Sequence, residues 1–331
     1  MDQVVISPTN RSPVIDIANW LCLVMAALAV VTHAGIKIYG SKSLDLETIL
    51  VSVALVFAIG QSAAVSVQTA NGYGTPQNDL TDSQRDTILK GNYAATILFF
   101  CSIAFSKFVI STFISSLTPK KVHRRINQGF FAFTGLWLLT AVLVSAFRCA
   151  PPDPWRNITS LKCIDYLAWW YGVTVLNIVS EVALVGLEIG VIMPLQMARQ
   201  RKAFITSLFA LRLIVTVAAA VQLYFYHKDH TGELSGDFSL GYWRSAVCTQ
   251  VVQCLAIFTT SLPYAKTIMD NLDSGLMGVK LGGETKGSGY GSGRTYELLD
   301  ISRSAKPSSR VDGGSVIRTT KTYTVETHDV K

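Results

Sequence analysis

Four ionisable side chains stand inside long apolar runs of this sequence, where a charge is costly: Lys107, Glu181, Glu188 and Arg212. Such residues are rare within membrane-spanning segments, and they mark ion pathways, switches or ion-paired helix contacts. At a rise of 1.5 Å per residue, Lys107, Glu188 and Arg212 share a depth of ~9–13 Å from one predicted boundary. We therefore expect an ion-paired cluster, which either holds a helix bundle together or forms a switch or part of a ligand or ion pathway.

The segment that carries both glutamates has one polar face. Asn177, Glu181 and Glu188 follow i, i+4, i+11 spacing, which places them on the same side of a helix. Gly186 and Gly190 form a G-x-x-x-G pattern roughly opposite, a pattern typical of close helix packing. The sequence predicts that this helix is buried between its neighbours.

Catalytic and cofactor motifs are missing from the sequence. It contains no H-E-x-x-H, no G-x-S-x-G, no P-loop and no paired metal-ligand cysteines. Lys266, the lysine near the last apolar run, stands at the end of that run, whereas a retinal Schiff base needs a lysine midway along it. We expect no enzyme, no metal site and no cofactor.

Composition indicates the elements that must position the four charged residues. Of 331 residues 50% are hydrophobic and 15% charged, against about 25% charged in soluble proteins. Runs of about 20 apolar residues can cross a bilayer, and seven occur, at 15–38, 47–70, 92–116, 128–147, 166–194, 204–227 and 243–267. In the second run, Gln61 and Gln68 share one helical face, which is expected to point into the bundle.

The fold prediction is an all-α, polytopic bundle of seven transmembrane helices over residues 15–268. A short extracellular segment, 1–14, precedes it, and a disordered cytosolic tail, 269–331, rich in Gly, Ser, Thr and Lys, follows it. The net charge of +7 does not indicate nucleic acid binding, because the basic residues flank apolar runs. The partner that the composition does predict is a lipid bilayer.

Two basic connections predict the orientation of the bundle. They contain Lys120, Lys121, Arg124 and Arg125 in the third connection, and Arg199, Arg201 and Lys202 in the fifth. By the positive-inside rule both face the cytosol, so the amino terminus lies outside and the carboxyl terminus inside. We expect an integral protein of the plasma membrane whose basic residues form the surface for a cytosolic partner.

The fourth connection, CAPPDPWRNITSLKC (149–163), then faces the outside. In that oxidising compartment we expect Cys149 and Cys163 to form a disulfide; two free thiols, or pairing with another chain, are the alternatives. The acceptor patterns at Asn157 and Asn10 both fall on the predicted outer side and are candidate glycosylation sites.

The middle third of the chain resembles the fungal rhodopsin-like family of integral membrane proteins from filamentous fungi, which is related to CFEM-containing pathogenesis receptors. The matching residues are Cys149, Pro151, Trp155, Cys163, Asn177, Glu181, Pro194, Leu195, Gln196, Met197, Lys202 and Phe209. The resemblance covers roughly residues 16 to 270 and implies a seven-helix, receptor-like protein. Departures from the pattern include the acid of the fifth helix, which is Glu181 rather than Asp, and the absence of a cysteine-rich CFEM module before the bundle.

Two functions follow as hypotheses. The first is a receptor with an unknown extracellular ligand and a heterotrimeric G protein, or another signalling protein, as its cytosolic partner. The alternative is a transporter or channel whose pathway is lined by Lys107, Glu181, Glu188 and Arg212.

Overall fold

The computed structural model describes residues 6–7, 9–41, 45–117, 121–149, 155, 163–193, 199–232 and 236–278. They all belong to one structural unit, Met1–Lys280, whereas Leu281–Lys331, most of the predicted tail, lie outside the described residues. The elements are α1 (Ser12–Ser41), α2 (Leu46–Ala70), the short 3-10 helix η1 (Gln77–Asp79), α3 (Asp82–Leu117), α4 (Lys121–Ala146), α5 (Tyr166–Ile192), α6 (Arg199–Ala210), α7 (Leu213–Thr231) and α8 (Trp243–Gly278).

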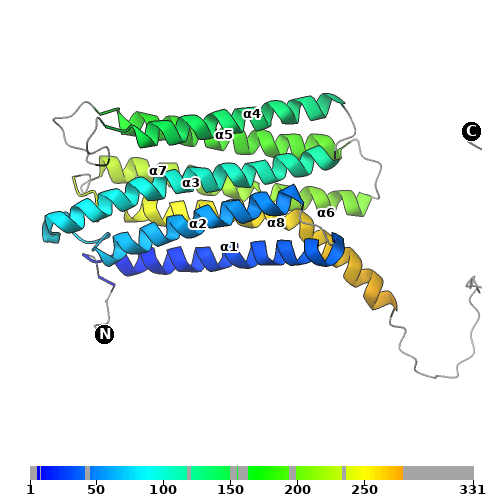
Figure 1. Cartoon of the computed structure of the whole chain (residues 1–331), viewed down its shortest axis with the longest axis horizontal. Helices are drawn as coiled ribbons and strands as arrows, with labels where there is room; N and C mark the ends of the chain where they lie inside the picture. Colours follow the sequence, from blue (N-terminus) through cyan, green and yellow to red (C-terminus); the bar gives the residue numbers. More distant parts are fainter. Residues whose placement is uncertain are drawn as a thin grey trace, which may run out of the picture. The chain divides into compact units, whose positions relative to one another are not determined.

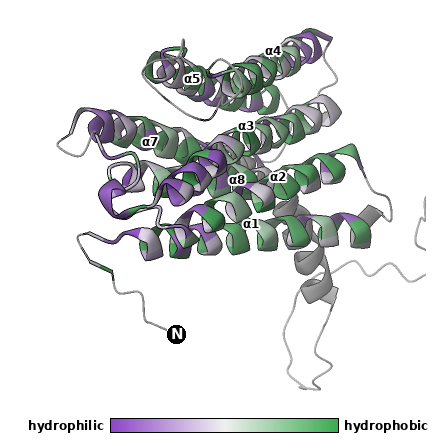
Figure 2. Cartoon of the chain, turned by 60° about the vertical axis from the view of Figure 1, so that its left-hand side comes forward, coloured by the Kyte–Doolittle hydropathy of each residue, from purple (hydrophilic) through white to green (hydrophobic). Residues whose placement is uncertain are grey.

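Among the described residues, seven helices are long and apolar enough to cross a membrane, and they coincide with the seven predicted spans. The sixth span, Thr206–Thr231, takes in both the end of α6 and the whole of α7. Large apolar side chains such as Leu28, Val31, Leu136 and Val217 face outward. Hydrophobic residues follow the helices, and hydrophilic residues gather near the loops (Figure 2), as a bundle surrounded by lipid requires.

The helices lie side by side along the bundle, and α3 runs through its middle (Figure 1). α3 packs against α2, α4, α5 and α8, and it has the largest buried share of the seven spans. A capping box starts this helix, because Thr81 N donates to Gln84 Oε1 (2.9 Å) and Gln84 N donates to Thr81 Oγ1 (3.4 Å). Because α3 packs against four helices, its polar side chains can contact several of them.

The bundle has two chemically different ends. The disulfide end carries the start of α1, the α2–α3 and α7–α8 connections, and the bond between Cys149 and Cys163. The basic end carries Lys121, Arg124 and Arg125. α8 passes through Pro263 and continues to Gly278, beyond the expected start of the tail at 269.

A glycine turn after α2 organises the disulfide end. Gly72 and Gly74 have φ of 94° and 97°, which favours glycine. Gly74 O accepts from Arg11 N (2.8 Å), and Gly74 N donates to Ser239 Oγ (3.0 Å). Through this one residue the turn joins the segment before α1 to the α7–α8 connection.

Candidate ligand pocket and buried charge cluster

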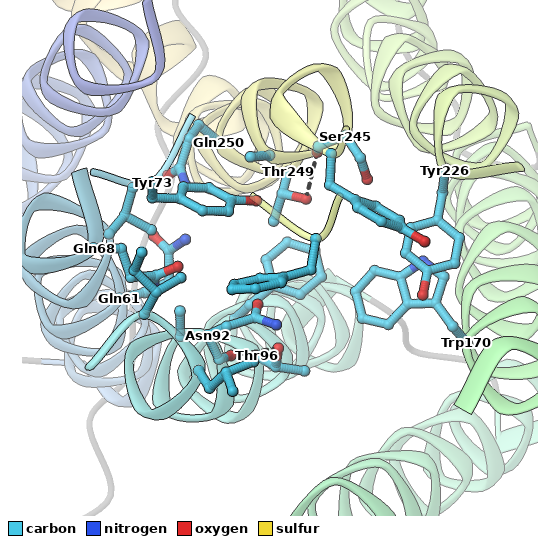
Figure 3. Close-up of a pocket in the computed structure, with 18 of the residues that line it drawn as sticks. Gln61, Gln68, Tyr73, Asn92, Thr96, Trp170, Tyr226, Ser245, Thr249 and Gln250 are labelled. Atoms are coloured by element: carbon cyan, nitrogen blue, oxygen red, sulfur yellow. Dashed lines mark hydrogen bonds between the residues drawn. The ribbon is translucent and has the colours of Figure 1, made fainter. Parts of the chain in front are cut away.

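A cavity of about 240 Å³ opens between the helices at the disulfide end (Figure 3). Its walls come from α2, α3, α5, α7 and α8, together with Tyr73 of the α2–α3 connection and Arg148 just after α4. Gln61 and Gln68 point from α2 toward the cavity, which confirms that this polar face lies inside the bundle. Amides, hydroxyls and aromatic rings are the groups that small-molecule sites combine.

Two tyrosines of the cavity, Tyr73 and Tyr242, stay neutral. Burial raises the pKa of Tyr73, and the negative charge of Asp229 raises it further. Burial likewise raises the pKa of Tyr242, again with a contribution from Asp229. Neither phenol carries charge at physiological pH, and among the described residues that line the cavity Arg148 is the one with a charged side chain.

The predicted disulfide is present between Cys149 and Cys163. Beside it, Ile164 N donates to Arg148 O (3.1 Å), so the bridge and this hydrogen bond together fix the backbone of Arg148. Trp155 of the same connection donates from Nε1 to Asp86 Oδ1 of α3 (3.1 Å), and Lys90 Nζ lies 5.1 Å from the centroid of its ring. The connection is thereby tied to the start of α3.

Replacing Cys163 with serine is expected to lower the free energy of unfolding by about 3 kcal/mol, because the bridge closes a loop that gains entropy in the unfolded chain. The two cysteines are 14 positions apart in the sequence. Thermal unfolding in detergent measures the effect, and reductant should destabilise the wild type but not the variant. The control is Cys101→Ser, which removes a free thiol of α3; equal unfolding temperatures for both variants would contradict the prediction.

A cluster of buried charges lies further along the same helices. Glu181 Oε2 accepts from Arg212 Nε at 2.9 Å, and Glu181 Oε1 lies 3.4 Å from Lys107 Nζ. The three side chains are 1–2% exposed. Lys107 Nζ also donates to Asn177 O (3.2 Å) and to Ser180 Oγ. One carboxylate therefore compensates two buried cations.

Glu188, expected in the same cluster, forms no ion pair among the described residues. Both of its carboxylate oxygens lack a hydrogen-bond partner among the described residues, although the side chain is buried. The helix ends explain the difference, because depth must be counted from them. Lys107 lies ten positions before Leu117 and Glu181 eleven before Ile192, whereas Glu188 lies only four before Ile192. Glu181, rather than Glu188, shares the depth of Lys107.

The sixth span is interrupted beside the cluster. α6 ends at Ala210 and α7 begins at Leu213, with Leu211 and Arg212 in a turn. Neither Gly nor Pro marks this interruption in the sequence. Arg212 stands at the break, and its Nη1 and Nη2 have no hydrogen-bond partner among the described residues.

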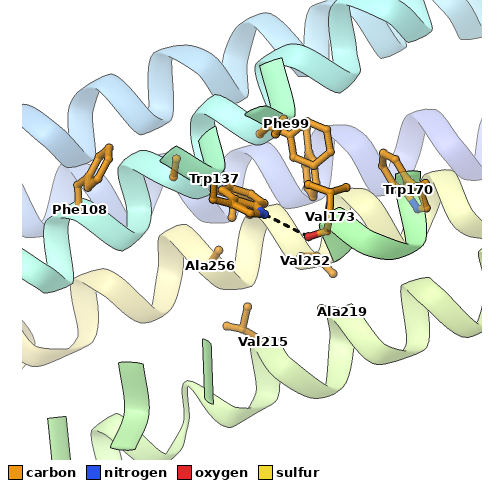
Figure 4. Packing of buried hydrophobic residues seen from close by; sticks show 13 residues of the cluster. Phe99, Phe108, Trp137, Trp170, Val173, Val215, Ala219, Val252 and Ala256 are labelled. Carbon is orange, nitrogen blue, oxygen red and sulfur yellow. Dashed lines mark hydrogen bonds between the residues drawn. The ribbon is translucent and has the colours of Figure 1, made fainter. Parts of the chain in front are cut away.

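Aromatic side chains of the buried core lie between the cavity and the charge cluster. Figure 4 shows two of them, Trp137 and Trp170. Trp170 lines the cavity, and its ring centroid lies 5.7 Å from that of Phe100. The Phe100 ring meets the Trp137 ring edge-on at 5.7 Å, and Lys107 Nζ lies 5.4 Å from the Trp137 centroid. Trp137 Nε1 donates to Val173 O (3.2 Å). A continuous packed path thus leads from the cavity to Lys107.

The remaining predicted residues are placed as follows. Asn10 Oδ1 accepts from Ser12 N (3.2 Å), and the Ser12 hydroxyl donates to Tyr73 O (2.5 Å). Asn157 and Lys120 lie outside the described residues, as do the side chains of Arg199 and Arg201. Lys121, Arg124 and Arg125 are exposed on the first turns of α4, and Lys202 Nζ donates to Met193 O.

Retinal does not fit the cavity. The side chains that line it include no lysine with which to form a Schiff base. Lys107 is held by Glu181 in the charge cluster, and Lys266 follows Pro263, outside the residues whose side chains are described. No step of any mechanism is therefore assigned to this chromophore.

These features define a seven-helix integral membrane protein with a cavity at one end. The chain belongs to the fungal rhodopsin domain family, whose model matches residues 33–271. No curated protein matches its sequence.

Proposed function

We propose that this protein is a receptor of the fungal plasma membrane. A ligand from outside binds in the cavity at the disulfide end and changes the packing of α3, α5 and α7. The basic end then contacts a cytosolic signalling partner of the heterotrimeric G-protein type. The proposal takes the disulfide end as the outer end, which follows from the positive-inside rule.

One observation carries the proposal: three helices that line the cavity also hold the charge cluster. On each helix, one residue lines the cavity and another belongs to the charge cluster. They are Thr96 and Lys107 on α3, Trp170 and Glu181 on α5, and Tyr226 on α7 with Arg212 just before it. Eleven residues separate the two sites on α3 and on α5, or about 16 Å of helix. A ligand that favours one arrangement of these helices shifts the population of both sites.

Proximity labelling from a tag on the carboxyl-terminal tail tests the partner. In fungal cells we expect heterotrimeric G-protein subunits to be enriched over a control seven-helix protein. Replacing Arg124 and Arg125 with glutamine should reduce that enrichment severalfold, because both cations are exposed at the basic end. Lys228→Gln, at the other end of the bundle, is the matched control and should leave it unchanged. No enrichment from an abundant, correctly oriented protein would overturn the proposal.

The interrupted sixth span favours a second candidate, a transporter or channel. Discontinuous helices that carry charge at mid-membrane are typical of transport sites, and Arg212 stands at such a break, bonded to Glu181. Proton or alkali-cation flux through proteoliposomes distinguishes this candidate. Flux that disappears in Glu181→Gln protein of intact fold, without any G-protein enrichment, would make transport the better description.

A further inference from the structure

The guanidinium of Arg148 lines the cavity and has hydrogen-bond donors without a partner among the described residues. The residue is 9% exposed, and its Cζ lies 3.7 Å from the centroid of the Tyr166 ring. Its Nε and Nη2 are buried without a hydrogen-bond partner among the described residues. These two nitrogens form one edge of the guanidinium, the edge that binds a carboxylate through two parallel hydrogen bonds.

Two further polar atoms of the cavity have no hydrogen-bond partner among the described residues. The indole Nε1 of Trp170 is a buried donor, and Oε1 of Gln61 is a buried acceptor. The two residues stand on opposite sides of the cavity (Figure 3). Trp170 stands on the same side as Arg148, because its ring centroid lies 6.0 Å from that of Tyr166. Hydrogen-bond donors without a partner therefore lie on one side of the cavity, and an acceptor without a partner lies on the other.

Buried polar atoms without partners are costly, so this pattern describes what a ligand supplies. It needs an acceptor-rich group for the side of Arg148 and Trp170, and a donor for Gln61. The walls between these sides include Phe99, Tyr226 and Tyr242, whose rings favour a flat apolar body. The volume of about 240 Å³ exceeds the roughly 150 Å³ of an apolar cavity that binds benzene, so a single ring with polar substituents fits.

We propose that the cavity binds a small, ring-bearing organic acid. Its carboxylate pairs with the Nε and Nη2 edge of Arg148 and accepts from Trp170 Nε1, and a hydroxyl or amino group at its far side donates to Gln61 Oε1. This assignment rests on the proposed receptor function for its biological role, but not for its chemistry.

Aromatic walls also suit quaternary ammonium ions, which bind over ring faces. Arg148 decides between the two charges. It already lies over the Tyr166 ring, and none of the residues that line the cavity is acidic. The nearby carboxylate, Asp229, is already paired with Arg244 at 3.1 Å. A cation would therefore meet the positive charge of Arg148 in a site of low dielectric constant, whereas a carboxylate neutralises that charge.

The test uses the full chain in nanodiscs and a panel of hydroxylated benzoates, with para-hydroxybenzoate first, beside their amides and tetramethylammonium. Bound ligand raises the unfolding temperature. We expect the acids to do so at millimolar concentration, and the amides and tetramethylammonium far less. Arg148→Gln should weaken acid binding by about tenfold or more, the loss of a charge-assisted hydrogen bond, and should leave amide binding unchanged.

Two further variants cover the case in which Arg148→Gln does not fold. Arg148→Lys keeps the charge but lacks the planar fork, so acid affinity should fall severalfold. Trp170→Phe removes the unpartnered N–H together with part of the ring, so the acids should weaken more than the amides, which report the loss of ring contact alone. Equal binding of acids and amides, tighter binding of tetramethylammonium, or no response to any acid would each overturn the assignment.

The result is independent of signalling. Acid binding without G-protein enrichment would uphold this site and overturn the receptor proposal. G-protein enrichment without acid binding would do the reverse.

Discussion

Replacing Glu181 with glutamine is expected to lower the free energy of unfolding by about 3–5 kcal/mol, the cost of removing one partner from a buried ion pair. The reason is that Glu181 is the carboxylate that contacts both Lys107 and Arg212. The isosteric amide would leave two buried cations without a counter-charge in contact. Thermal unfolding in detergent, together with the yield of monodisperse protein, measures the loss.

Glu188→Gln is the matched control for this prediction. Glu188 lies on the same helix, is equally buried and undergoes the same chemical change, but its oxygens have no hydrogen-bond partner among the described residues. We expect little change or a slight gain in stability. Adding Lys107→Met to Glu181→Gln should recover part of the loss, because one of the two uncompensated cations disappears. Equal losses in the two glutamine variants would show that Glu181 has no special role.

Replacing Gly74 with alanine is expected to cost at least about 2–3 kcal/mol, in the range typical of residues forced into sparsely populated backbone conformations. Gly74 has φ of 97°, and a Cβ there would lie 2.7 Å from Ser12 N and 3.0 Å from the carbonyl carbon of Arg11. Both atoms are backbone, so no side chain can move aside. The contact between the segment before α1 and the α7–α8 connection would open.

The matched control for this substitution is Gly35→Ala. Gly35 lies within α1, and no atom lies within 4 Å of the Cβ that alanine would add. Alanine in a helix is favoured over glycine by roughly 0.5–1 kcal/mol, so this variant should be slightly more stable than the wild type. A Gly74→Ala protein as stable as Gly35→Ala would contradict the structural role of the turn.

The seven spans and the disulfide could be predicted because each depends on a local property of the chain. A span needs only an apolar run of sufficient length, and Cys149 and Cys163 are close in sequence and share one connection. The polar face at Gln61 and Gln68 was also recognisable, since helical periodicity alone places both residues on one side.

The cavity could not be predicted in this way. Its lining is drawn from residues between 61 and 250, and one sequence does not reveal which helices are neighbours. Arg148 was overlooked because a cation at the end of a span is ordinarily an interfacial residue that reaches water. The one sequence signal near it was the adjacent Cys149, whose disulfide fixes the backbone at this point.

The carboxylate that pairs with the buried cations could be identified only from the observed ends of the helices. A difference of one or two turns separates Glu181 from Glu188 in depth, and helix boundaries read from sequence carry errors of about two to four residues. The interruption at Leu211 and Arg212 has no sequence signal, since tertiary contacts of the arginine, rather than Gly or Pro, accompany it.

That interruption makes α6 a short lever. Its pivot is Arg212, which is bonded to Glu181, and its far end, Arg199, belongs to the basic end. Twelve residues of helix measure about 18 Å, so a rotation of roughly 10° at the pivot moves the far end by roughly 3 Å. A small change at the contact between Glu181 and Arg212 would thereby become a larger displacement at the basic end.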